Sequence, residues 1–248
     1  MGKVIFESAS VDRVMDKRGK LYLIPAPLGD GDITDVIPAG VLSVIPGIKH
    51  FVVEELRSAR RYLSKAGMKG RIDELEFYVL NEHNVREGSE SYIELLLDGN
   101  DVGLISEAGL PAVADPGASL VEQAHRKDIT VIPLVGPSSL MLALMASGKN
   151  GQSFAFVGYL PVKSDERRSK LKELERLSNV SGQSQIFIET PYRNHSMMSD
   201  IMQVCSERTT ITVAAGLTTP DAYVRTLSVR DWKREKFNID KIPCVFII

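Results

Sequence analysis

Short apolar runs alternate with helix-like patterns along the first 150 residues of the chain. Strands are predicted at 21–24, 50–53, 77–80, 102–105 and 130–134, and helices after the second strand, over about 117–127 and over 138–147. This alternation of strand and helix is typical of βαβ units, which build parallel sheets. Because the runs are apolar without alternation, we expect both faces of the sheet to be covered.

The second half of the chain begins after a polar, glycine-rich stretch at 148–153. Strands are predicted at 154–157, 186–188, 211–214, 223–227 and 243–248, with a long charged helix from 164 to about 177. Strands that follow one another late in the chain favour a mixed, partly antiparallel sheet. We therefore predict an α/β protein with an N-terminal extension (1–19), a mostly parallel α/β domain (20–150) and a mixed α/β domain (151–248).

The composition is that of a globular protein with a sizeable core. Of the 248 residues 44% are hydrophobic, and the net charge of −2 confines any RNA contact to local basic patches. Cys205 and Cys244 have neither metal-ligand nor disulfide spacing, so we expect reduced thiols, no metal site and a cytoplasmic location. The apolar stretch 131–147 is broken by prolines and the N-terminus has no apolar signal segment, so no membrane contact is predicted.

Loops rich in glycine and proline follow the predicted strands at 25–32, 106–117 and 135–139. The carboxyl ends of parallel strands meet at one edge of a sheet, so we expect these loops to converge on a ligand there. Glycine lets the backbone approach a ligand, although turn formation alone also accounts for such residues in any single loop. Neither a dinucleotide fingerprint nor a Walker loop is present, which argues against a nucleotide phosphate as the ligand.

An ordered set of motifs runs along the chain: Leu-Tyr-Leu-Ile-Pro-Ala-Pro-Leu-Gly-Asp (21–30), Ser-Glu-Ala-Gly-Leu-Pro (106–111), Asp-Pro-Gly (115–117), Gly-Pro-Ser-Ser (136–139), Phe-Ala-Phe-Val-Gly-Tyr-Leu-Pro-Val-Lys (154–163) and Glu-Thr-Pro-Tyr-Arg (189–193). This set resembles the tetrapyrrole methylase superfamily, in particular its branch of ribosomal small-subunit RNA ribose 2′-O-methyltransferases I. Each motif is weakly specific, but their order from about residue 20 to residue 219 is strongly so.

The resemblance implies two α/β domains, a homodimer, and S-adenosylmethionine bound in a bent form in the cleft between the domains. It further implies transfer of the methyl group of this donor to ribosomal RNA. Carried over by position, the expected cofactor-binding residues are Pro27, Gly109, Leu110, Pro111, Ala114, Ser138, Ser139, Thr190, Ala215, Leu217, Pro243 and Cys244. Loop backbone at these positions would suit adenine, ribose and amino-acid groups.

A ribose hydroxyl is a weak acid, so methyl transfer to it calls for a base or an electrostatic stabiliser nearby. The candidate catalytic residues are Glu55, Arg57, Glu107 and Arg193, and Glu54 also stands at a strand end. Contacts with RNA are expected from Arg57, Arg60 and Arg61 in one helix, and from Lys163, Arg167, Arg168, Lys170 and Lys172 in another. Solvated helix faces are the more common explanation of such groups, and acidic residues interleave with the second.

The chain also departs from the pattern of the RNA-modifying branch. It has Glu-Leu-Arg at 55–57 for Asp-Thr-Arg, Leu110 for threonine, and uncharged residues at 215–219 for Arg-Glu-Leu-Thr-Lys, and it lacks that branch's C-terminal extension. These differences leave cofactor binding as the expectation but keep the acceptor open. The alternatives are a methyltransferase for a tetrapyrrole-like small molecule, and a non-catalytic paralogue that binds S-adenosylmethionine and serves in assembly.

Overall fold

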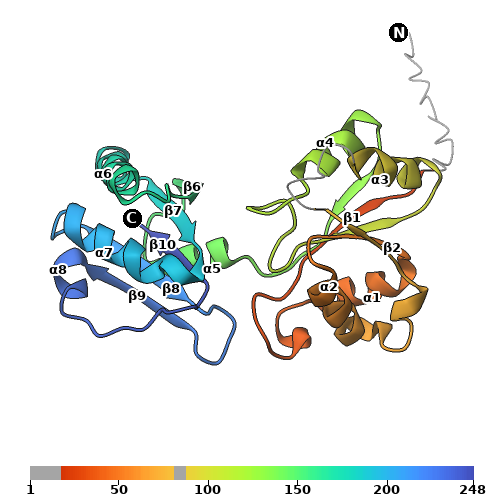
Figure 1. Cartoon of the computed structure of the whole chain (residues 1–248), viewed down its shortest axis with the longest axis horizontal. Coiled ribbons are helices and arrows are strands. Elements are labelled where there is room, and N and C mark those ends of the chain that lie inside the picture. The colour runs from red at the N-terminus through yellow and green to blue at the C-terminus, as the bar shows by residue number, and fades with distance from the viewer. Residues whose placement is uncertain (1–17, 81–87) are drawn as a thin grey trace, which may run out of the picture.

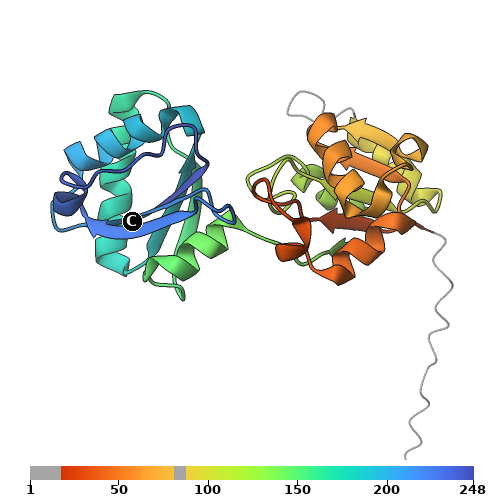
Figure 2. The same cartoon turned by 90° about the horizontal axis from the view of Figure 1, so that it is seen from below.

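A computed structural model of the chain describes residues 18–80 and 88–248 and shows two α/β domains side by side (Figures 1 and 2). Each domain is built on a five-stranded sheet. The predicted extension over residues 1–19 lies almost entirely outside the described residues. In the part of the chain that the structure describes, no helix is long and apolar enough to cross a membrane.

The first sheet has the strand order β3-β2-β4-β1-β5, and all its pairings are parallel. Its strands are β1 (Leu21–Ile24), β2 (His50–Val53), β3 (Glu76–Val79), β4 (Val102–Ile105) and β5 (Val131–Pro133). This confirms the predicted parallel sheet, with ends that differ from the predicted ones by a residue at most. The central position of β4 explains its uninterrupted apolar sequence, since all its residues are buried.

Helices cover both faces of this sheet and bury a separate core on each. They are α1 (Ala39–Val44), α2 (Leu56–Leu63), α3 (Gly88–Leu97) and α4 (Ala118–Arg126). Phe51 packs with α1 and α2 on one face, whereas Val52 packs with α3 and α4 on the other. Gly103 in β4 has no room for a side chain, because a Cβ there would lie 2.7 Å from Ile24 Cδ1. The helices α1 and α3 were not predicted from the sequence.

The second sheet has the order β6-β7-β10-β8-β9 and is mixed, as predicted: β6 and β7 run parallel, and the remaining pairs are antiparallel. Its strands are β6 (Phe154–Tyr159), β7 (Ser184–Glu189), β8 (Thr210–Ala215), β9 (Tyr223–Ser228) and β10 (Cys244–Ile247). The helices α6 (Ser164–Ser181), α7 (Asn194–Val204) and α8 (Val229–Trp232) accompany it. One face of the sheet carries the largest core of the molecule, around Phe187, Phe246 and Trp232.

The helix α5 (Ser139–Ser147) belongs by packing to the second sheet, although the sequence analysis assigned residues up to 150 to the first domain. Leu140, Ala143 and Leu144 are buried against Ala214 and Val245 of the second sheet. Figure 1 shows α5 beside β8 and β10, after the chain has crossed from the first domain. The chain therefore crosses between the domains ahead of α5, because the apolar face of α5 finds its partner in the second sheet.

Candidate functional site

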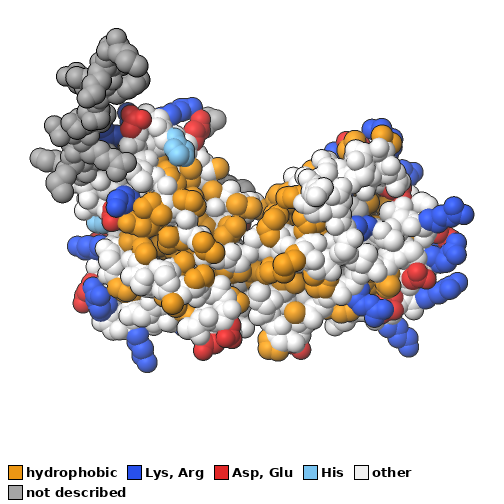
Figure 3. Space-filling model, turned by 180° about the vertical axis from the view of Figure 1, so that it is seen from behind, with side chains coloured by type: hydrophobic (Ala, Val, Ile, Leu, Met, Phe, Trp, Pro, Cys, Tyr) orange, Lys and Arg blue, Asp and Glu red, His pale blue; other side chains and the backbone are white. Residues whose placement is uncertain are grey.

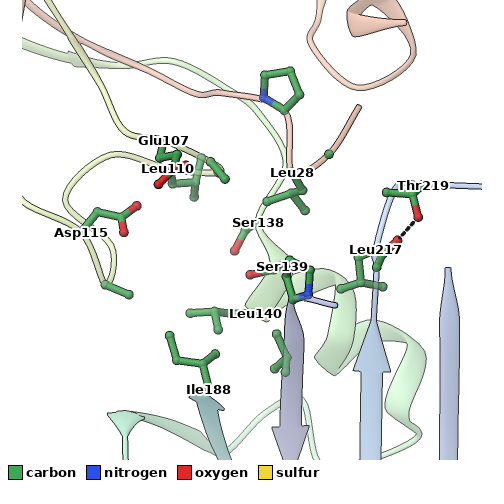
Figure 4. Close-up of a pocket in the computed structure, with 18 of the residues that line it drawn as sticks. Leu28, Glu107, Leu110, Asp115, Ser138, Ser139, Leu140, Ile188, Leu217 and Thr219 are labelled. Carbon is green, nitrogen blue, oxygen red and sulfur yellow. Dashed lines mark hydrogen bonds between the residues drawn. The ribbon is translucent and has the colours of Figure 1, made fainter. Parts of the chain in front are cut away.

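A cavity of about 690 Å³ lies between the two domains, at the carboxyl edge of the first sheet. Residues of the loops after β1, β4 and β5 form its wall on the side of the first domain. Residues at the ends of β6, β7 and β8 and the start of β10 form its wall on the side of the second. Figure 4 shows side chains from both domains around this space. The convergence of the three loops that the sequence predicted is thus confirmed.

Backbone hydrogen bonds and close packing hold these loops together. Ala26 and Gly109 exchange hydrogen bonds, with N···O distances of 2.8 and 3.0 Å, which joins the loop after β1 to the loop after β4. Gly109 has a φ of 77°, a left-handed conformation that favours glycine. A Cβ on Gly136 would lie 2.2 Å from Pro25 Cβ, so the loop after β5 also packs closely on the loop after β1. The close packing requires glycine at position 136, and the left-handed backbone favours glycine at position 109.

The loop after β5 leads directly into α5, whose first residues form part of the wall. The Ser138 hydroxyl caps α5 by accepting a hydrogen bond from the Met141 N–H at 3.4 Å. Ser138 and Ser139 both line the cavity, and Figure 4 shows their side chains near its centre. The N-terminus of α5 therefore presents hydroxyls and free backbone N–H groups to any ligand in the cavity.

The wall from the second domain is mostly apolar. Ile188 at the end of β7 and Leu217 after β8 face the space, together with Pro243, Cys244 and Val245 near β10. Figure 4 shows Ile188 and Leu217 approaching the cavity from different strands of the second sheet. The turn that carries Leu217 is fixed by a hydrogen bond from the Thr219 hydroxyl to the Gly216 carbonyl at 2.7 Å. Such a surface suits a flat or apolar part of a ligand.

The residues predicted from the resemblance divide into two groups. Those that line the cavity are Pro27, Gly109, Leu110, Ala114, Ser138, Ser139, Leu217, Pro243 and Cys244. Those that lie just outside it are Pro111, Thr190 and Ala215, each next to a lining residue. For Ala215 the reason is strand alternation, because Ala214 faces the cavity and Ala215 points into the core on the other face of the sheet.

Acidic side chains gather at one end of the cavity. Glu54 and Asp115 line it with Glu107, and the Glu54 carboxylate accepts a hydrogen bond from the Glu107 N–H at 3.0 Å. Burial raises the pKa of Asp115 to about 6, helped by the charges of Glu54 and Glu107 and opposed by the Ser106 hydroxyl. Among the described residues no group of three or more possible ligands is arranged to hold a metal ion.

The second domain contributes the buried carboxylate of Glu189 and the side chain of Tyr159 to the same end of the cavity. The Glu189 side chain is 0% exposed and lines the cavity. Its Oε1 accepts hydrogen bonds from the Thr190 N–H at 2.6 Å and from Arg193 Nε and Nη2 at 2.9 and 2.6 Å. Its Oε2 is buried and has no hydrogen-bond partner within residues 18–80 and 88–248. Arg193 itself is outside the wall, where it holds Glu189, and its charge also acts on Tyr159.

The other candidate catalytic residues have different environments. Glu55 caps α2, accepting hydrogen bonds from the N–H groups of Arg57 and Ser58 at 2.9 and 2.7 Å, which lowers the pKa of its carboxyl. Neither Glu55 nor Arg57 lines the cavity, whereas Glu107 does. The charge of Glu55 is thus used in holding the first turn of the helix, where a carboxylate is favourable.

The basic residues predicted to meet RNA also have distinct positions. Arg60 forms an ion pair with Asp73 at 2.6 Å, while Arg61 lines the cavity together with Lys65, one helical turn further on. Arg167 is buried and bonded to the Asp200 carboxylate, which excludes it from any nucleic-acid surface. The prediction for Arg167 was wrong, because its place on α6 faces the core contact with α7 instead of solvent.

Sequence reasoning missed several lining residues, notably Tyr159, Ile188 and Lys65. Ile188 ends a predicted strand (186–188), whereas Tyr159 lies two residues beyond the predicted end of another (154–157), because β6 runs on to Tyr159. Lys65 follows Arg61 by four residues, which places both on one helix face and was also readable. Nothing in the sequence indicated that Glu189 Oε2 lacks a hydrogen-bond donor among the described residues, because this depends on which groups surround the oxygen in the folded protein.

Comparison with known proteins gives a consistent result. The model of the tetrapyrrole (corrin/porphyrin) methylases matches residues 20–232. A ribosomal RNA small subunit methyltransferase I of Vibrio cholerae is 33% identical over 199 residues, covering 80% of this chain and 65% of the relative. The protein of that name from Escherichia coli O157:H7 is 30% identical over 237 residues, covering 94% of this chain and 78% of the relative.

Solved structures show the same architecture at low sequence identity. Diphthine synthase superposes with a TM-score of 0.65 at 14% identity, covering 93% of this chain and 90% of that one. The methyltransferase CobJ superposes with a TM-score of 0.59 at 17% identity, covering 92% and 93%. Identity at this level establishes the fold alone, while the family match spans most of the sequence. The chain therefore belongs to the tetrapyrrole methylase family of methyltransferases.

Proposed function

We propose that this chain binds S-adenosylmethionine in the cavity between its domains and transfers the methyl group to ribosomal RNA, at a ribose 2′-oxygen. Support for the reaction comes from the family match and from relatives that are named ribosomal RNA small subunit methyltransferase I. Support for the position comes from the cavity, which draws on both domains and on the loops after three parallel strands. A cytoplasmic location follows from this proposed substrate.

The residues of the cavity fit such a donor. A volume of about 690 Å³ falls within the range of small-molecule sites. Leu110, Leu140, Ile188 and Leu217 provide apolar surface for an adenine ring, and the Ser138 and Ser139 hydroxyls provide polar contacts. The carboxylates at one end suit a ligand with positively charged sulfonium and ammonium groups. When bound, the donor supplies a methyl group on a sulfur that is a good leaving group.

The protein itself holds the methyl donor and the acceptor, orients them and encloses them. Loops tied together at Ala26 and Gly109 present a preformed wall, so little conformational entropy is lost when a ligand binds. The buried Glu189 Oε2 accepts no hydrogen bond from the described residues, and a ribose hydroxyl or an ammonium group of the ligand could donate one to it. Alignment of donor and acceptor within a water-poor cleft is the main source of rate in such transfers.

RNA is the proposed acceptor because the relatives are named for it and because basic side chains border the cavity. Arg61 in α2 and Lys65 in the helical segment that follows it (Ser64–Met68) line the cavity on the side of the first domain. Positively charged groups there would bind phosphates next to the nucleotide that enters the cleft. The overall negative charge of the chain confines the RNA contact to this region and to exposed basic side chains near α6, such as Lys163 just before its first residue.

A homodimer is part of the proposal. Figure 3 shows hydrophobic side chains gathered over one face of the molecule and across the junction of the two domains. Val135 is 73% exposed, and Met141 and Met145 on α5 are 45% and 78% exposed. Exposed apolar side chains in such number typically mark a protein interface. Sedimentation velocity is expected to show a dimer, with Met145→Glu shifting the population toward monomer.

The observation that carries the proposal is the cavity itself, and calorimetry with S-adenosylmethionine tests it. We expect saturable binding to the wild type, and a loss of at least tenfold in affinity for Ser139→Trp, which places an indole in the cavity. The control is Val180→Trp, because Val180 is 77% exposed at the far end of α6. A flat titration with folded wild-type protein would refute the proposed donor.

Labelled-methyl transfer tests the acceptor. Small ribosomal subunits and bulk RNA from a strain that lacks this protein are incubated with the enzyme and labelled donor, and the modified nucleotide is identified by mass spectrometry. Label at a ribose 2′-oxygen of ribosomal RNA supports the proposal. Donor binding without transfer to RNA would point instead to a small-molecule acceptor or to a non-catalytic binding protein.

A further inference from the structure

Methylation of a hydroxyl requires that its proton leave, and the site described above contains several groups that could take it. We propose that Asp115 is the proton acceptor for the methylated hydroxyl. This inference rests on the proposed function and extends it, since it assigns a chemical role to one side chain of the cavity. The case depends on the position of Asp115, on the occupation of the competing carboxylates and on an unsatisfied oxygen nearby.

Asp115 is held at the cavity wall by an unusual stretch of backbone. Ala112 and Ala114 have φ values of 64° and 66°, and Gly117 has a φ of 130°. Left-handed conformations at alanine cost of order 1 kcal/mol or more each, so the fold maintains this loop against local preference. The loop places Asp115 half-buried at the cavity, and Figure 4 shows its side chain on the same side as Glu107.

The other carboxylates of the cleft are committed or less suited. Glu55 uses both oxygens to cap α2, and Glu54 accepts a hydrogen bond from the Glu107 N–H. Glu189 already uses one carboxylate oxygen to accept hydrogen bonds from Arg193 and from the Thr190 N–H. Glu107 is exposed to solvent. Glu54 and Asp115 are both half-buried beside other carboxylates, and among the described residues only Glu54 of the two accepts a hydrogen bond from a backbone N–H.

The surroundings of Asp115 bring the pKa of its carboxyl close to neutral pH. The titratable groups that face it are Glu54 after β2, Glu107 in its own loop and Tyr159 at the end of β6. Burial raises the pKa of Asp115 to about 6, whereas a solvated aspartate would be a far weaker base. A general base works best when its pKa lies near the operating pH. Asp115 is then mostly ionised at pH 7 yet basic enough to bind a proton.

Tyr159 faces Asp115 from the second domain and completes the acceptor end of the cleft. Its side chain is 54% exposed and lines the cavity. Burial of part of the ring raises the pKa of its phenol, and the charges of Asp115, Glu189 and Glu54 raise it further. The phenol therefore stays protonated and serves as a hydrogen-bond donor to an incoming nucleotide. The charge of Arg193 opposes this rise in pKa, and with Asp115 from the first domain and Tyr159 and Glu189 from the second, both domains contribute to this end.

Glu189 Oε2 gives independent evidence that a ligand belongs here. A fully buried carboxylate oxygen without a donor is costly, of order 1–3 kcal/mol or more. Its partner within the described residues is missing, and the side chain forms part of the cavity wall. A ligand that brings N–H or O–H groups to this end would satisfy it. The acidic groups around Asp115 therefore border a ligand-binding space rather than a solvated surface.

The proposed step balances as follows. Asp115 takes up the proton of the acceptor hydroxyl on one carboxylate oxygen while the hydroxyl oxygen forms its bond to the methyl carbon. The bond between this carbon and sulfur breaks, and the sulfur keeps the electron pair, so that a cation becomes a neutral thioether. The neutral Asp115 carboxyl then loses its proton to water when the products leave.

Asp115→Asn, Asp115→Glu and the surface control Glu122→Gln test the proposal. General-base catalysis contributes about 10²–10⁴ in rate, so Asp115→Asn is expected to lower kcat by at least about 100-fold. Its calorimetric affinity for S-adenosylmethionine should stay within about threefold of wild type. The wild-type kcat/KM, whose pH dependence reports the free enzyme, should fall below a pH near 6, and Asp115→Glu should recover part of the activity and keep an acid limb.

A second readout does not depend on turnover. At pH 6 a carboxyl with a pKa of about 6 is half protonated, and a bound cation lowers that pKa. Donor binding to the wild type should therefore release up to about half a proton, measured by calorimetry in buffers of different ionisation enthalpy. Asp115→Asn should abolish this release, and Glu122→Gln should preserve it.

The results that would refute the role of Asp115 differ from the result that would refute the proposed function. If Asp115→Asn keeps kcat within about threefold, or if it releases the same number of protons as wild type, Asp115 is not the proton acceptor. If Asp115→Asn loses donor affinity by more than about 30-fold, the residue belongs to the donor site and the assignment is wrong. Absence of donor binding to the wild type would instead refute the proposed function itself.

Discussion

The raised pKa of Asp115 has a consequence for stability that can be measured without any substrate. Replacement by asparagine keeps the shape of the side chain and removes its ability to ionise. In the folded protein the pKa is about 6, against an ordinary value of 3.8. The folded state therefore binds the proton of this carboxyl more tightly than the unfolded state does. Ionisation of the Asp115 carboxyl therefore costs more free energy in the folded protein than in the unfolded chain.

The sign follows from proton linkage. Well below pH 3.8 the carboxyl is protonated in both states, so its titration adds nothing to the difference between wild type and Asp115→Asn. As the pH rises through 3.8 and on to 6, the unfolded state ionises first and the wild type loses stability. Each pKa unit is worth about 1.4 kcal/mol, so the full effect is roughly 3 kcal/mol, and screening by solvent at a half-buried group reduces it to about 1–2 kcal/mol.

Urea unfolding at pH 4.0 and 7.5, followed by circular dichroism without ligand, measures this effect. The difference in unfolding free energy between Asp115→Asn and wild type should be more favourable to the variant at pH 7.5 than at pH 4.0, by about 1–2 kcal/mol. Effects of the substitution that do not involve charge cancel in this comparison. An equal difference at both pH values, or a change of the opposite sign, would refute the reasoning about the electrostatics of the cleft.

Further predictions concern other parts of the molecule. Asp200→Ala removes the carboxylate that binds buried Arg167, and a loss of about 3–5 kcal/mol in unfolding free energy is expected; a loss below 1 kcal/mol would contradict this. Gly136→Ala should weaken donor binding by at least about tenfold in calorimetry, because its Cβ would lie 2.2 Å from Pro25 Cβ and push the loops apart. Arg61→Glu should lower RNA affinity and reduce the slope of log affinity against log salt by about one; an unchanged slope argues against a phosphate contact.

Much of the fold could be predicted from local pattern. Apolar runs such as 102–105 indicated buried parallel strands because a central strand is covered on both faces. The loops after β1, β4 and β5 were expected at one edge because parallel strands end together, and their side chains do line one cavity. Periodicity and turn chemistry act within a few residues, so a single sequence carries them directly.

Tertiary structure alone decided which side chains meet. Ala214 faces the cavity while Ala215 enters the core, α5 packs on the second sheet, and Arg167 is buried while Arg61 lines the cleft. The opposition of Asp115 and Tyr159 depends on how the domains close on one another. Such pairings depend on the packing of faces far apart in sequence, where burial and charge are set by neighbours that local pattern does not specify.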